Sequence, residues 1–193
     1  MQYTMPTIFL ASGSPRRLEL LKNLDLNVRQ KKLPFTEKIN RRLSSNKIAE
    51  EISYYKAKQA ITHIKNDEIL LTADTIVCKG NEILVKPRNQ NEAFEFLTKL
   101  SDTSHSVITG VTMGIPNKLS TFSAETKVYF EPLSKQEIHY YVEKYKPLDK
   151  AGAYGIQEWI GWSKIFKIEG SFSNVMGLPT HMIHNYLVNW QKS

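Results

Sequence analysis

The chain has 193 residues, of which 41% are hydrophobic and 10% aromatic, and it carries a formal net charge of +7. This length fits one sizeable domain with its own core, so we expect a single domain over residues 1–193, and the composition excludes a largely disordered chain. The single cysteine, Cys78, excludes an internal disulfide framework and a multi-cysteine zinc site. The positive charge indicates an anionic ligand, either nucleic acid or a small phosphorylated molecule.

The chain start does not resemble a secretion signal, because its apolar run (IFLA) is short and no basic segment precedes it. No other stretch is long and apolar enough to span a bilayer. Together with the lone cysteine, these features predict a cytoplasmic protein that does not associate with membranes.

The first predicted elements are a short strand over residues 7–11 and an amphipathic helix after it. Ser14 is the expected N-cap, and Pro15 is the expected first helical residue, where a missing N–H is harmless. Arg16 and Arg17 follow, so that the stretch ASGSPRR places small residues and two positive charges at a helix N-terminus. This joint fits a phosphate-binding site, but an ordinary capped helix would look the same.

A second helix is predicted over residues 45–65, with Lys56 beside its apolar stripe. Asp74 interrupts an apolar strand, and a turn at 79–81 precedes a short strand at 83–85. Later predicted elements are a helix at 91–100, a hairpin of strands at 104–115 and 120–130, a helix from the capping box of Ser134 and Glu137 to Tyr145, a loop-rich stretch punctuated by glycines, and a last helix from Pro179. This mixture predicts an α/β architecture around a mixed sheet.

Four charged residues could act on a phosphate ester. Asp74 follows an apolar run, where a carboxylate needs a cation, a metal or hydrogen-bond donors, although it could instead cap a turn. Lys86 would lie near Asp74 if the turn at 79–81 folds the chain back. Lys56 could also reach solvent from its helix edge, and Glu37 is the single acid in a basic segment that could be solvated surface. Carboxylates that hold a divalent ion and cations that neutralise a leaving group suit metal-assisted attack of water on phosphate.

Several other classes of site are disfavoured. The glycines form no phosphate-binding loop of the GxxxxGK[ST] type, and no serine has the surroundings of a nucleophile. The five histidines lack a convincing metal-ligand spacing, and His181 and His184 are expected to face solvent on the last helix.

Several motifs in order resemble the Maf family of nucleotide pyrophosphatases over nearly the whole chain. They are ASGSPRR, ADTIV, KP, LSDTSHSVITGV, PLDKAGAYGIQ and GSFSNVMGLP. The resemblance implies a Maf/ITPase-like fold, in which helices flank a mixed twisted sheet with a nucleotide-binding cleft. It also implies hydrolysis of nucleoside triphosphates between the α and β phosphates, which yields a monophosphate and pyrophosphate with Mg²⁺ or Mn²⁺ and removes noncanonical nucleotides.

The motifs also imply roles for individual residues. Asp74 would activate the water, Ser14 and Arg16 would hold phosphates, and Glu37, Lys56 and Lys86 would complete the catalytic set, with Glu37 and Asp74 as metal ligands. Arg17, Thr75 and Gln157 occupy the positions that mark the branch resembling dTTP/UTP pyrophosphatases. The amide of Gln157 can both donate to and accept from a uracil or thymine edge.

Two alternatives remain open. The same chemistry could act on 7-methyl-GTP or another modified nucleotide, because Glu158 to Trp162 replace the glycine-rich loop of many relatives. The chain could also be a non-enzymatic, basic nucleic-acid-binding module, but that would leave ADT and GIQ without a role. The interpretation as a dTTP/UTP pyrophosphatase predicts a nucleoside triphosphate substrate and no stable nucleic-acid partner. By resemblance, a homodimer is one option.

Overall fold

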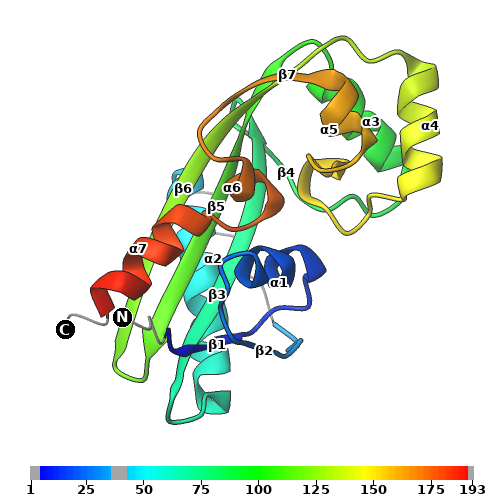
Figure 1. Ribbon diagram of the computed structural model, residues 1–193. Helices are drawn as coiled ribbons and strands as arrows, with labels where there is room; N and C mark the ends of the chain where they lie inside the picture. The colour runs from blue at the N-terminus through cyan, green and yellow to red at the C-terminus, as the bar shows by residue number, and fades with distance from the viewer. Residues whose placement is uncertain (1–4, 36–42, 191–193) are drawn as a thin grey trace. The chain divides into compact units, whose positions relative to one another are not determined.

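The computed structural model describes residues 5–35 and 43–190. Helices and strands are interspersed along this part of the chain, as the mixed periodicity predicts (Figure 1). In order they are β1 (Thr7–Leu10), α1 (Pro15–Lys22), β2 (Val28–Gln30), α2 (Ser45–Ala60), β3 (Glu68–Lys79), β4 (Glu82–Leu84), α3 (Gln90–Leu100), β5 (Ser104–Ile115), β6 (Lys118–Phe130), α4 (Lys135–Tyr145), α5 (Trp159–Lys164), β7 (Ile165–Glu169), α6 (Phe172–Met176) and α7 (Thr180–Trp190), with single 3-10 turns η1 (Ile61–His63) and η2 (Ala151–Ala153).

The strands form a mixed sheet in the order β2-β1-β3-β5-β6-β7, with β4 paired to β3. β1 pairs in parallel with β2 and β3, whereas β4 and β7 pair antiparallel with their neighbours. The expected α/β architecture with a mixed sheet and flanking helices is therefore confirmed. None of the helices within residues 5–35 and 43–190 combines the length and apolarity that crossing a bilayer requires.

The chain divides into two compact units. The first comprises Met1–Asp74, Thr109–Ala124 and Gly177–Ser193, and the second comprises Thr75–Ile108 and Glu125–Met176. Each of β3, β5 and β6 therefore contributes one half to each unit.

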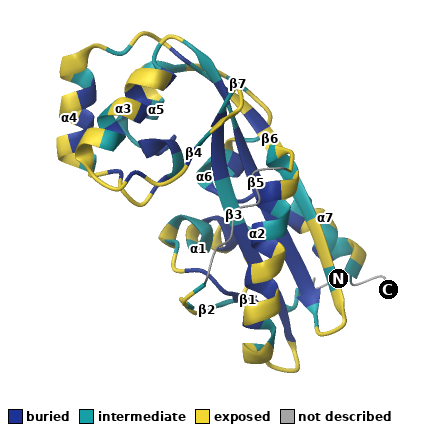
Figure 2. Cartoon of the chain, turned by 180° about the vertical axis from the view of Figure 1, so that it is seen from behind, coloured by how far each residue is buried: buried dark blue, intermediate teal, exposed yellow. Residues whose placement is uncertain are grey.

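In the first unit, α2 and α7 cover opposite faces of the long strands. Ser53 of α2 bonds to Thr112 of β5, while Tyr186 of α7 lies against Phe122 of β6 with a ring distance of 6.4 Å. Figure 2 shows exposed and buried residues alternating along α2, as expected of a helix with one face on a sheet.

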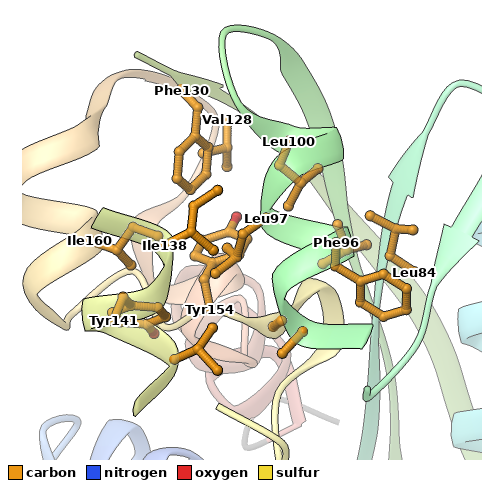
Figure 3. Packing of buried hydrophobic residues seen from close by; sticks show 14 of the residues in the cluster. Leu84, Phe96, Leu97, Leu100, Val128, Phe130, Ile138, Tyr141, Tyr154 and Ile160 are labelled. Carbon is orange, nitrogen blue, oxygen red and sulfur yellow. The ribbon is translucent and has the colours of Figure 1, made fainter. Parts of the chain in front are cut away.

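The core of the second unit lies between α3, α4 and the adjoining strand halves (Figure 3). Tyr141, Leu97, Leu100 and Phe130 are almost fully buried there. His105 also lies in this core, and its Nε2 is 2.7 Å from Tyr154 Oη. Burial, and then the nearby Lys79 ammonium, lower the pKa of His105 to about 3, so this ring is neutral at physiological pH.

Most predicted elements are confirmed, including the capping box of Ser134 and Glu137. Three expectations were wrong. The second α-helix ends at Ala60 and tightens into η1, where β-branched Ile61 and Thr62 disfavour a further α-turn. Asp74 does not interrupt its strand, and the stretch expected to be loop-rich contains α5, β7 and α6. Those three elements are five or six residues long, so they give little periodic signal.

Candidate active site

The joint between β1 and α1 is a capped helix start, as predicted. Ser14 is the N-cap, its hydroxyl accepts from the Arg17 amide at 3.4 Å, and Pro15 opens the helix. The hydroxyl of Ser12 in turn accepts from the Ser14 amide at 3.2 Å. Gln30 Nε2 donates to the carbonyls of Ser12 and Ser14 at 2.9 and 3.1 Å, and so holds the loop from β2. The exposed Gly13 between them keeps this backbone open to an anion.

Arg17 connects this joint to the end of the buried half of β3. Its guanidinium donates to the carbonyl of Ala73 at 2.8 Å, to that of Gly177 at 3.0 Å and to the Ser12 hydroxyl at 3.4 Å. Ala73 directly precedes Asp74, so the arginine-bearing helix start and the candidate catalytic strand meet within the first unit. Arg16, the next residue towards the N-cap, is half-buried in the same first turn of α1.

Asp74 forms an ion pair with Lys56. Lys56 Nζ lies 2.7 Å from Asp74 Oδ1, and the two side chains are only 10% and 15% exposed. A carboxylate at this depth requires a cation, a metal or hydrogen-bond donors, and Lys56 is such a cation. Lys56 is therefore the cation that compensates the charge of Asp74 in an apolar strand, and the ion pair allows β3 to continue through Asp74.

A row of hydroxyl groups fixes α2 against the strand beside this ion pair. The Thr72 hydroxyl donates to the carbonyl of Ser53 at 2.8 Å, and Ser53 Oγ lies 3.0 Å from Thr112 Oγ1. Thr72 and Asp74 share one face of β3 because side chains alternate along a strand, and Ser53 and Lys56 share one face of α2 at a spacing of three. The two periodicities therefore match Ser53 to Thr72 and Lys56 to Asp74.

In the second unit, the β3–β4 hairpin contains the other catalytic candidate. Cys78 pairs with Ile83 and Val77 with Leu84, so the predicted turn over residues 79–81 is confirmed. Lys86 is exposed and lies two residues beyond the end of β4. The position of Lys86 relative to Asp74 stays a prediction.

Gln157 belongs to the segment between η2 and α5. Its side-chain Oε1 is buried and accepts no hydrogen bond within the described part of the chain. Its main-chain carbonyl accepts from the indole Nε1 of Trp162 at 3.0 Å. An unsatisfied buried amide oxygen is costly, so it commonly indicates a site for an external donor.

Two expectations about metal binding involve a residue that the structure does not describe. Glu37 lies outside residues 5–35 and 43–190. Within those residues, no three histidine, cysteine or acidic side chains are grouped so that they could hold a metal ion. His181 and His184 are exposed, as predicted.

The sequence analysis missed the residues that hold the candidate side chains in place. Ser12 and Gln30 fix the loop before α1, and Ser53 and Thr72 fix α2 beside Asp74. Only Ser12, inside ASGSPRR, carried a sequence signal. The other three are single polar residues whose partners lie far away in the chain.

The family model described as Maf-like protein matches residues 7–190. The chain belongs to the Maf family. Curated relatives are similar over almost their full length. A protein of Flavobacterium johnsoniae named dTTP/UTP pyrophosphatase is 44% identical over 93% of this chain and 93% of its own. Proteins of the same name from Phocaeicola vulgatus and Porphyromonas gingivalis are 45% and 42% identical, over 93% and 96% of this chain and 94% and 95% of theirs.

Two solved structures show weaker similarity to this chain. A HAM1 protein from Coxiella burnetii is 17% identical, with a TM-score of 0.46 over 65% of this chain and 73% of its own. The Ham1 protein of Staphylococcus aureus is 13% identical, with a TM-score of 0.44 over 64% of this chain and 71% of its own.

Proposed function

We propose that this Maf protein hydrolyses UTP and dTTP to the nucleoside monophosphate and pyrophosphate. Support comes from the Maf relatives named dTTP/UTP pyrophosphatase at 42% to 45% identity. The single observation that carries the proposal is the meeting of the arginine-bearing helix start with the buried Lys56–Asp74 pair through Arg17 and Ala73. An anion-binding helix tip beside a charged acid–base pair suits attack on a phosphate.

The proposed reaction is direct attack of water on the α-phosphorus. Asp74 accepts one proton of the water as the new phosphorus–oxygen bond forms. Because Lys56 binds Oδ1, we assign this proton to Oδ2. The bond between the α-phosphorus and the bridging oxygen breaks, and pyrophosphate leaves with the electron pair.

Phosphate binding is assigned to the loop and first turn of α1. Ser14 and Arg16 bind phosphate oxygens, since backbone N–H groups, a hydroxyl and a guanidinium are the donors that phosphate favours. Arg17 donates to main-chain carbonyls through Nε and Nη1, so we assign it to orienting the first turn of α1. Thr75 is assigned to substrate selection. Lys86 and Lys56 offset charge that develops on the phosphates.

Gln157 is proposed to read the base. Its Oε1 would accept the N3–H of uracil or thymine, while Nε2 would donate to the neighbouring carbonyl. The buried, unpartnered Oε1 supports this assignment, because a ligand donor would relieve an otherwise costly acceptor.

A divalent metal, Mg²⁺ or Mn²⁺, fits the residues present. Magnesium is commonly bound by one or two carboxylates together with substrate phosphates, so a complete protein cage is not required. Asp74 would supply one such oxygen donor, and Glu37 is proposed as the second. The metal would neutralise charge on the phosphate oxygens.

The direct test is pyrophosphate release from UTP and dTTP with Mg²⁺, with orthophosphate detected separately. Asp74→Asn should lower kcat by at least about a hundredfold, since the water loses its proton acceptor. Asp67→Asn is a matched control, because Asp67 is an exposed residue of the same unit. Its kcat should equal that of the unsubstituted protein.

The substitution Asp74→Asn leaves the buried Lys56 without its carboxylate and so could destabilise the fold. Circular dichroism would therefore first establish that the variant is folded. Release of orthophosphate alone would mean that a different bond is cut and would refute the proposed reaction. Equal pyrophosphate release by folded Asp74→Asn would refute the role of Asp74.

A further inference from the structure

The segment that carries Gln157 is held by three side chains of the second unit. Lys150 Nζ lies 3.1 Å from Glu158 Oε1, and the Tyr141 hydroxyl donates to Glu158 Oε2. The amide of Gly155 donates to the same Tyr141 oxygen at 3.0 Å. Tyr141 thus contacts the chain on both sides of Gln157, through Gly155 and Glu158. We call Lys150, Glu158 and Tyr141 the reader clamp.

The reader clamp is shielded from solvent. The side chains of Lys150 and Glu158 are 9% and 18% exposed, and Tyr141 is fully buried. Burial, and then the hydrogen bond to Glu158, raise the pKa of Tyr141, so the phenol keeps its proton and donates it to the carboxylate. An ion pair at this depth gains little net stability over apolar residues of the same size. The ion pair between Lys150 and Glu158 is therefore better explained by positioning of the segment around Gln157 than by stabilisation of the fold.

The local backbone is shaped around Glu158. A Cβ on Gly155 would lie 2.8 Å from Glu158 Cδ, so a larger residue at this position would require the Glu158 carboxylate to shift. The Trp162 indole donates to the main-chain carbonyl of Gln157 from α5. The main chain of Gln157 is consequently held through its own carbonyl and through residues on both sides of it.

A fixed amide can distinguish uracil from cytosine. Uracil and thymine present an N3–H donor beside a carbonyl, whereas cytosine presents an N3 acceptor beside an amino group. An amide held in one orientation satisfies only one of these two patterns, and an amide that can shift or flip tolerates both. Discrimination therefore depends on what prevents Gln157 from moving.

We infer that the reader clamp positions Gln157 and thereby sets the preference for uracil and thymine over cytosine. This inference rests on the proposed function, because it needs Gln157 to read the base. Lys150, Glu158 and Tyr141 are positioning residues in this view, and they act on the substrate through Gln157.

The test compares kcat and KM for UTP and CTP in Lys150→Met. The substitution keeps an unbranched side chain of nearly the same length and removes the charge that pairs with Glu158 and with the neighbouring Asp149. A displaced Gln157 should raise KM for UTP about tenfold and lower the UTP-to-CTP ratio of kcat/KM about tenfold, with kcat for UTP changed less than about twofold. Lys150→Arg should restore the ratio, because a guanidinium can still pair with the carboxylate.

A matched control removes a different ion pair from the same unit. Lys164 Nζ lies 2.6 Å from Glu137 Oε1, and neither residue belongs to the segment around Gln157. Lys164→Met should leave the UTP-to-CTP ratio unchanged. If it shifts the ratio as much as Lys150→Met does, the effect is general destabilisation and the inference is overturned. Glu158→Gln provides a second variant if Lys150→Met does not fold.

Two further results separate this inference from the proposed function. Gln157→Ala should lower the UTP-to-CTP ratio, and Lys150→Met should have no additional effect in that background. If Gln157→Ala leaves the ratio unchanged, the assignment of Gln157 as the reader fails. If Gln157→Ala lowers the ratio but Lys150→Met only lowers the melting temperature, the reader assignment stands and the reader clamp is merely structural.

Discussion

At the scale of single residues, Lys56 and Asp74 depend on one another. Each side chain would be an uncompensated buried charge without its partner, and such a charge costs far more than the ion pair gains. Replacing one partner should therefore lower the free energy of unfolding more than replacing both. This difference can be measured without an activity assay.

Lys56→Met should lower the free energy of unfolding by about 3 kcal/mol, because it leaves the Asp74 carboxylate without a cation. The double variant Lys56→Met/Asp74→Asn should lose clearly less than the sum of the single losses. Urea unfolding of the three variants measures both quantities. Additive losses would show that the two charges do not interact in solution.

An exposed ion pair on the same helix supplies the reference. Lys47 pairs with Glu50 at 2.7 Å, but the lysine side chain is 67% exposed. Lys47→Met should change the free energy of unfolding by less than about 1 kcal/mol.

The sequence indicates that Asp74 and Lys56 are candidate site residues, but it does not indicate that they pair with each other. Asp74 stands out because a carboxylate in an apolar strand needs a cation, a metal or hydrogen-bond donors, and Lys56 because it lies on the edge of an apolar helix face. Their pairing depends on the register of α2 against β3, which Ser53 and Thr72 set through buried hydrogen bonds. Register between a helix and a strand arises from tertiary packing, so no local pattern could reveal it.

At the scale of elements, α2 lies unusually close to β5. A Cβ on Gly110 would lie 2.2 Å from both the carbonyl carbon and the carbonyl oxygen of Ala49. Backbone atoms cannot move aside as a flexible side chain can, so a methyl group here must displace the helix that carries Lys56.

Gly110→Ala should therefore destabilise the protein by about 2 to 3 kcal/mol and lower kcat for UTP. Gly80→Ala is an informative comparison, because Gly80 has a φ of +57° and no atom within 4 Å of the added Cβ. That substitution should cost only about 1 kcal/mol, from backbone strain in the β3–β4 turn, and should leave kcat unchanged. Thermal unfolding and steady-state assays measure both effects. Equal losses in the two variants would mean that the close approach of α2 to β5 does not determine the outcome.

Elements with a clear hydrophobic period were predictable, and short ones were not. The capped helices α1 and α4 begin where Ser14 and Ser134 predict. β7 and α6 are five residues each, and the glycines around them suggested a loop. Tertiary contacts fix this region instead: Asn174 of α6 donates to the carbonyl of Val107 at 3.1 Å and to the Thr126 hydroxyl at 3.0 Å.

At the scale of the whole molecule, the net charge of +7 favours non-specific contact with nucleic acid at low salt. Such binding arises from released counterions and requires no dedicated site. Charge alone therefore cannot distinguish the proposed enzyme from a nucleic-acid-binding module, but the salt dependence of binding can.

Single-stranded RNA should bind weakly at low ionic strength and be released by about 0.2 M salt, whereas hydrolysis of UTP should persist at that salt concentration. Fluorescence anisotropy of a labelled oligonucleotide and pyrophosphate release, measured across the same salt series, provide the comparison. A complex that survives 0.2 M salt would favour the nucleic-acid-binding alternative.

The contacts of Arg17 can form only in the order in which their partners are synthesised. This one side chain bonds to carbonyl groups 56 and 160 residues further along the chain. Because the ribosome delivers the N-terminal part first, the guanidinium must wait until the segment after α6 has been translated before its last partner exists. The bond between Arg17 and Gly177 thus forms only late in synthesis, although Arg17 is encoded among the first codons.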